Sequence, residues 1–175
     1  MKNKVVLLIT LIVCFFLQCT LVQNIAIGSI VPNLLIIFVV SMGLMRGQQT
    51  GLFTGFLVGL LADLFYGDYL GIQAFLYMIV GYFSGFAWEI YYDNNIKVPM
   101  MLAAGGDFLY NIGDFSFRSL LRANVGFTFF FRRILVPELI YTVILTAIVY
   151  RIFYLINHRF MKQKNKERES IWLLK

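Results

Sequence analysis

One stretch of the chain carries most of the residue types that could take part in chemistry. Acidic, amide and basic side chains recur there at intervals of three or four residues: Asp107, Asn111, Asp114, Arg118 and Arg122. This spacing places all five on one side of an α-helix. Aligned carboxylates inside a membrane can form a path for protons or substrate, or they can belong to a structural network of ion pairs. We favour the structural network.

A further carboxylate is expected at a similar depth. Glu138 lies near the start of the last long apolar stretch, and we hypothesise that it forms an ion pair there. The candidate partners are Arg118, Arg122 and Arg133. Asp114 precedes Arg118 in the order that favours an ion pair four residues apart. A carboxylate facing acyl chains costs about 3 kcal/mol on insertion scales, so these side chains should face protein or water.

Signatures of catalysis are not found elsewhere. The single histidine, His158, lies in a basic segment with no nucleophile or metal ligand beside it. Cys14 and Cys19 form neither a CxxC pair nor a group with a second ligand type. No glycine loop of the phosphate-binding type occurs. We therefore predict a protein that is not an enzyme and that uses no cofactor and no metal.

The composition indicates the environment of these residues. Of the 175 residues, 60% are hydrophobic, only 14% are charged and 18 are Phe. A water-soluble domain of this size would need more polar surface, so lipid is predicted to surround most of the chain. A nucleic-acid partner is not expected.

Apolar stretches that suit membrane helices, at about 20 residues each or somewhat less, occur in six places. The predicted spans are residues 5–21, 30–45, 51–66, 70–88, 98–117 and 134–156. We thus predict an all-α integral membrane protein, with a six-helix transmembrane domain over residues 1–157 and a basic tail over residues 158–175. The tail is expected to be solvated and loosely ordered from Lys162 to Glu169.

The positions of Lys and Arg predict the orientation of the chain in the membrane. With the N-terminus inside, an even number of spans places all but four of the 15 basic residues in the cytoplasm, where loops usually retain them. Both termini are therefore expected to be cytoplasmic, and the basic tail with them. The four exceptions belong to a Phe-rich segment that could lie along the outer surface as an interfacial element: Arg118, Arg122, Arg132 and Arg133.

Glycines recur at four-residue intervals in the third and fourth predicted spans. One face carries Gly51, Gly55 and Gly59 and continues to Asp63, and the next span repeats the pattern with Gly81 and Gly85. Glycine lets a second helix approach closely. This face is either internal packing, which we favour, or a contact with a partner. The turn residues at 67–69 predict that the two spans form an antiparallel hairpin.

Several short motifs follow one another along the chain: Pro32-Asn33-Leu34-Leu35, Gly43-Leu44-Met45-Arg46-Gly47, Gly51-Leu52-Phe53-Thr54-Gly55-Phe56, Gly59-Leu60-Leu61-Ala62-Asp63-Leu64, Leu70-Gly71-Ile72-Gln73-Ala74, Gly81-Tyr82-Phe83-Ser84-Gly85 and Pro137-Glu138-Leu139-Ile140-Tyr141-Thr142. Taken in order, they resemble the rod shape-determining protein MreD family. Their order and spacing, over about half of the chain, carry the resemblance. The family more often has Asp where Asn33 stands, so a charge-dependent role is not carried over to that position.

The resemblance implies a fold and a function. Proteins of this kind are similar in fold to the six-helix substrate-binding subunits of energy-coupling-factor transporters. They sit in the bacterial cytoplasmic membrane and belong to the machinery that synthesises the lateral cell wall. The implied partners are MreC, a RodA-type glycosyltransferase and a class B penicillin-binding protein, with MreB coupled indirectly and a homodimer as a further option. The glycine faces and outer polar groups would then be protein contacts, and the chain would bind one arrangement of its partners better than another.

Two alternatives stay open at this point. A vitamin-binding subunit of an energy-coupling-factor transporter would share the fold, but it needs an outward-facing polar pocket, and the first four spans offer few polar side chains for one. A small intramembrane lipid-modifying enzyme would need His, Asp or basic residues clustered at one interface. Only the stripe that begins at Asp107 resembles such a cluster. A scaffold for cell-wall synthesis is the function that we predict.

Overall fold

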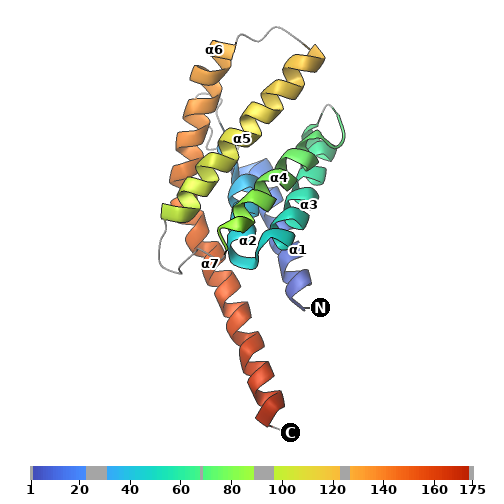
Figure 1. Ribbon diagram of the computed structural model, residues 1–175, viewed down its shortest axis with the longest axis vertical. Helices are drawn as coiled ribbons and strands as arrows, with labels where there is room; N and C mark the ends of the chain where they lie inside the picture. The colour runs from blue at the N-terminus through green and yellow to red at the C-terminus, as the bar shows by residue number, and fades with distance from the viewer. Residues whose placement is uncertain (1, 23–30, 68, 89–96, 123–126, 174–175) are drawn as a thin grey trace.

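The computed structural model describes residues 2–22, 31–67, 69–88, 97–122 and 127–173, and this part of the chain is helical with short connections. The all-α prediction is therefore confirmed. In chain order the elements are α1 (Lys2–Leu17), the π-helical turn η1 (Gln18–Val22), α2 (Leu34–Arg46), α3 (Gln48–Tyr66), α4 (Ile72–Phe86), α5 (Lys97–Arg122), α6 (Phe127–Phe130), the π-helical turn η2 (Phe131–Leu135) and α7 (Val136–Leu173) (Figure 1).

Each of the six predicted apolar segments contains a helix. Within the described residues, two helical stretches have the length and composition to cross a membrane on their own, Gln48–Tyr66 and Thr128–Leu155. Three shorter apolar helices accompany them: Val5–Thr20, Leu34–Arg46 and Ile72–Phe86.

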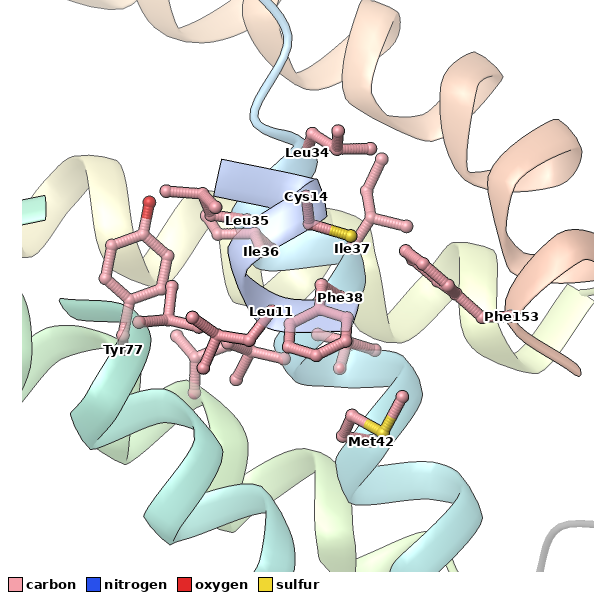
Figure 2. Packing of buried hydrophobic residues seen from close by; sticks show 14 of the residues in the cluster. Leu11, Cys14, Leu34, Leu35, Ile36, Ile37, Phe38, Met42, Tyr77 and Phe153 are labelled. Atoms are coloured by element: carbon pink, nitrogen blue, oxygen red, sulfur yellow. The ribbon is translucent and has the colours of Figure 1, made fainter. Parts of the chain in front are cut away.

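Helix α2 forms the centre of the molecule. Every residue from Leu34 to Met45 is buried, and α2 contacts α1, α3, α4, α5 and α7. Figure 2 shows the side chains of Ile36, Ile37 and Phe38 surrounded by residues from neighbouring helices, with Phe153 coming from α7. With 13 residues, α2 is about 20 Å long, shorter than a hydrocarbon core of about 30 Å. It is a core element that other helices enclose.

Two helix pairs pack on α2. Helices α3 and α4 make the most extensive contact in the described chain, and α5 packs against α7. In Figure 1 the two pairs lie on either side of α2. Residues from both pairs therefore meet at the start of α2, where the polar side chains gather.

The basic C-terminal segment differs from the prediction. Helix α7 continues without a break from Val136 to Leu173, so residues 158–173 are helical and not loosely ordered. The sequence from Glu138 to Leu173 contains neither Gly nor Pro, so no residue there stops the helix. At 38 residues α7 is about 57 Å long, and its end extends away from the other helices (Figure 1).

The segment from Arg118 to Arg133 also differs from the prediction of an element lying along the surface. Its first residues continue α5 as far as Arg122, and residues 127–135 form α6 and η2, which lead directly into α7. Residues 123–126 lie outside the described part of the chain. This region therefore lengthens two packed helices, since the sequence has no proline between residues 100 and 136.

A single residue connects α2 to α3. Gly47 has φ 87° and ψ 178°, a conformation that only glycine adopts without strain. Its N–H donates to the Gly43 carbonyl at 2.8 Å, and the Gly51 N–H donates to the Gly47 carbonyl at 3.0 Å. Arg46-Gly47 in the family motif thus marks a sharp turn that orients α3 relative to the core helix.

Replacing Gly47 by alanine is expected to lower the free energy of unfolding by about 1–3 kcal/mol, because the new side chain would occupy a strained backbone conformation. The site itself has room, since the nearest atom to an added Cβ is in Trp88 at 3.9 Å. Thermal unfolding of the detergent-purified chain measures the loss. Gly105→Ala is the matched control, because an added Cβ there meets nothing within 4 Å. Equal melting temperatures for the two variants would contradict the assignment.

Candidate functional site: a polar cluster at the start of α2

The family motif Pro32-Asn33 forms the N-terminal cap of α2. The Asn33 side-chain oxygen accepts hydrogen bonds from the Ile36 N–H at 3.1 Å and from the Tyr77 hydroxyl at 3.0 Å. The Asn33 N–H donates to the Thr142 hydroxyl at 3.2 Å. One buried asparagine thereby joins the core helix to α4 and α7. An aspartate at this position could accept the same two hydrogen bonds.

Gln18, the first residue of η1, completes this cap. Its side-chain oxygen accepts a hydrogen bond from the Leu34 N–H at 2.8 Å, and its nitrogen donates to the Pro32 carbonyl at 3.2 Å. Sequence reasoning missed Gln18. The available signal was a glutamine at the end of an otherwise apolar run, where a polar side chain requires a partner.

The row of polar residues on α5 that begins at Asp107 lies in the same region. Asp107 is fully buried, and the Asn111 side chain donates to its backbone carbonyl at 3.0 Å and to its Oδ1 at 3.4 Å. The Thr142 hydroxyl also hydrogen-bonds to the Asp107 carboxyl group. The Oδ2 atom of Asp107 has no hydrogen-bond partner among the residues described. Two of the predicted stripe residues thus lie inside the protein and not toward lipid.

Glu138 belongs to this cluster through its contacts with α5. Its carboxyl group hydrogen-bonds to the Asn111 side chain and lies close enough to Asp107 and Asp114 to interact with their charges. No ion pair joins Glu138 to Arg133, because Arg133 lies on an exposed part of η2. The side chains of the other two predicted partners, Arg118 and Arg122, lie outside the described residues.

Aromatic and amide side chains extend the cluster toward α4. The rings of Tyr77 and Tyr110 lie 4.7 Å apart between centroids. The Tyr110 hydroxyl donates to the Gln73 side chain at 3.4 Å. These contacts link α5 to the first turn of α4. The polar cluster therefore contacts α2, α4, α5 and α7, and its described hydrogen bonds are between helices or within them.

The glycine face lies inside the molecule, at the contact between α3 and α4. A Cβ added at Gly51 would approach the Gly81 backbone closer than 3.0 Å, and one at Gly55 would approach the Tyr77 backbone equally closely. Gly59 faces Ala74, and Gly85 faces Gln48, again backbone against backbone. This face is therefore occupied by the chain itself and offers no surface to a partner.

Asp63 ends the glycine face by capping the neighbouring helix. Its carboxylate accepts three backbone hydrogen bonds from the start of α4, from Gly71 at 2.8 Å, Gln73 at 3.0 Å and Ala74 at 3.0 Å. Gly71, in the left-handed conformation with φ 102°, has no side chain with which to cap the helix itself. A carboxylate at a helix N-terminus also interacts favourably with the helix dipole.

The remaining motif residues lie at both ends of the bundle. Arg46 is half-buried at the end of α2, and Tyr141 is half-buried on α7 next to Thr142. Pro137 lies in the first turn of α7, directly after η2. Among the described residues, no group of three or more His, Cys, Asp and Glu side chains could hold a metal ion. What the cluster can do chemically is hold four helices in register through hydrogen bonds.

Comparison with protein families gives a match that covers the regions just described. Residues 1–161 match the family of the rod shape-determining protein MreD. The chain belongs to this family. As a member of the MreD family with apolar helices throughout its core, it is a membrane protein connected with cell shape, and the family is not a known enzyme family. No curated protein and no solved structure matches the chain. The MreD match includes the α2 cap, the glycine face and the polar cluster, and it ends within α7.

Proposed function

We propose that this chain is a non-catalytic component of the bacterial complex that synthesises lateral peptidoglycan. The observation that carries the proposal is the MreD match over residues 1–161. In this proposal six helical segments cross the cytoplasmic membrane, both termini are cytoplasmic, and the fold resembles that of the substrate-binding subunits of energy-coupling-factor transporters. The helical end of α7 then reaches into the cytoplasm.

The burial pattern supports a role in binding proteins. The polar side chains of the cluster form contacts within the chain, whereas several helices, α1 and α7 among them, present exposed apolar faces outward. The faces of these two helices comprise Val5, Leu8, Ile9, Ile12, Val13 and Phe16 on α1, and Ile140, Ile144, Ile148, Ile152 and Leu155 on α7. In a bilayer such faces contact lipid or pack against other membrane helices through van der Waals contacts.

The proposed partners are MreC, a RodA-type glycosyltransferase and a class B penicillin-binding protein, with MreB coupled indirectly. By binding one arrangement of these proteins more tightly than another, the chain would shift their population toward the active arrangement. The closely packed core favours this role, because a scaffold that deforms on binding would lose part of the binding energy.

Depletion of the protein in its native bacterium tests the proposal. Elongated cells are expected to become round and swollen, because lateral wall synthesis would lose its organisation, and microscopy of cell width measures this. The wild-type chain and Gly105→Ala should restore cell width. The packing variant Gly51→Ala with Gly55→Ala should not. Unchanged shape combined with lost vitamin uptake would instead select the transporter subunit.

A further inference from the structure

Two neighbouring arginines in η2 are exposed, and no described residue forms an ion pair with either. Arg132 and Arg133 both lie on the surface, and within the described residues neither forms an ion pair. The guanidinium of Arg133 lies over the ring of Phe129, 5.4 Å from its centroid. That contact holds one of the two charges in place but does not neutralise it.

The family motif residue Pro137 explains why both arginines lie in a π-helical turn. Proline has no N–H to donate to the carbonyl four residues earlier, and its ring clashes with that carbonyl, which belongs to Arg133. The backbone adjusts, and the Val136 N–H donates to the Phe131 carbonyl five residues earlier. The wider turn is therefore a consequence of the sequence, and it fixes the backbone that carries both arginines.

Apolar side chains surround the pair. Phe129, Phe131 and Ile134 are exposed beside the arginines, while Phe130 stacks on Phe115 of α5 at 4.6 Å between ring centroids. The stacking attaches this segment to the helix bundle. The mixture of exposed arginine and phenylalanine suits the membrane interface, where apolar groups enter the acyl region and cationic groups stay at the headgroups.

The spacing of basic residues along the helix indicates the depth of the arginine pair in the bilayer. Arg132 and Arg151 are separated by 19 residues, or about 28 Å along a helix, close to the thickness of a hydrocarbon core. Between residues 134 and 150 the sequence contains no Lys or Arg. Arg151 therefore marks one headgroup level, and the arginine pair marks the other.

We propose that Arg132 and Arg133 bind the phosphate of an anionic lipid headgroup at the membrane surface opposite Arg151. Phosphates are the anions present at that depth. Guanidinium groups bind phosphate oxygens through paired, charge-assisted hydrogen bonds. The neighbouring phenylalanines contact the first methylenes of the acyl chains, so the site takes a lipid in preference to a free phosphate.

Native mass spectrometry of the full-length chain in detergent tests this site by titration with phosphatidylglycerol or phosphatidylcholine. The double variant Arg132→Gln with Arg133→Gln is expected to bind the first phosphatidylglycerol roughly thirtyfold more weakly, since each basic residue near a membrane surface contributes about a fivefold attraction to anionic lipid. Phosphatidylcholine binding should not change. A matched double variant, Lys97→Gln with Arg151→Gln, removes the same amount of charge at the opposite end of the bundle. It should still bind phosphatidylglycerol in preference to phosphatidylcholine.

Three results would overturn the proposal: unchanged phosphatidylglycerol binding in the arginine variant, an equal loss in the matched variant, or displacement of phosphatidylglycerol by inorganic phosphate. Wild-type protein provides a second measurement that does not depend on a variant folding. Added salt should weaken binding of phosphatidylglycerol but not of phosphatidylcholine, because only the former is charge-driven. Binding of both lipids that is insensitive to salt would also refute the site.

Discussion

Replacing Gly51 and Gly55 together by alanine is expected to prevent the chain from accumulating as a folded membrane protein. Each new Cβ would approach backbone atoms of α4 closer than 3.0 Å, and backbone cannot move aside as a flexible side chain can. Overpacking of this kind costs about 1–3 kcal/mol at each site. The two sites lie one turn apart in the same contact, so α3 and α4 must separate along much of their length.

The amount of membrane-inserted protein and its melting temperature in detergent measure this effect. Gly105→Ala controls for the change of residue, since it lies on an exposed part of α5 and should raise helix propensity without a clash. Gly113→Ala provides an intermediate case, because an added Cβ there meets only the flexible side chain of Leu76. Wild-type stability of the Gly51 and Gly55 double variant would show that α3 and α4 are farther apart than described.

Replacing Asp63 by alanine should have the second-largest effect. Three backbone N–H groups at the start of α4 would lose their acceptor, and each buried donor left without a partner costs about 1–3 kcal/mol. Gly71 cannot replace the lost cap because it has no side chain. We expect α4 to unfold at its first turn and to loosen its contact with Tyr110.

A graded pair of variants makes this test specific. Asp63→Asn keeps one side-chain oxygen as an acceptor and should fall between wild type and Asp63→Ala in melting temperature. Hydrogen exchange at Gln73 and Ala74 should increase in the same order, because these amides donate directly to the carboxylate. If exchange increases uniformly over the whole chain and not first in α4, Asp63 acts through general stability and not as a cap.

Much of the fold follows from apolar length and glycine spacing. Six apolar runs correctly located the helices, because a chain in lipid must satisfy its backbone hydrogen bonds within each segment. The four-residue interval of Gly51, Gly55 and Gly59 indicated a close helix contact, and the structure places its partner in α4. In both cases the signal is local and periodic, and the physical constraint acts on the same residues that carry the pattern.

The polar cluster was harder to predict because its partners are distant in sequence. Asn33 and Thr142 are 109 residues apart, and the Asn33 cap depends on contacts from three other elements. The expected ion pair of Glu138 is absent for Arg133, because similar depth does not determine the direction in which a side chain points. For Arg118 and Arg122, whose side chains lie outside the described residues, the pair stays a prediction. The high charge density after residue 158 favours a solvated, loosely ordered segment, and it does not indicate that α7 continues to Leu173.

The short length of α2 has a consequence for how the protein is made. In the six-span arrangement proposed above, this helix enters the bilayer when only α1 precedes it, so lipid at first covers most of its apolar surface. At about 20 Å it is too short to match an undistorted bilayer, and the mismatch must be met by local thinning or by a position nearer one leaflet. We expect the newly inserted segment to settle at full depth only when later helices enclose it, which makes their arrival a step in membrane integration.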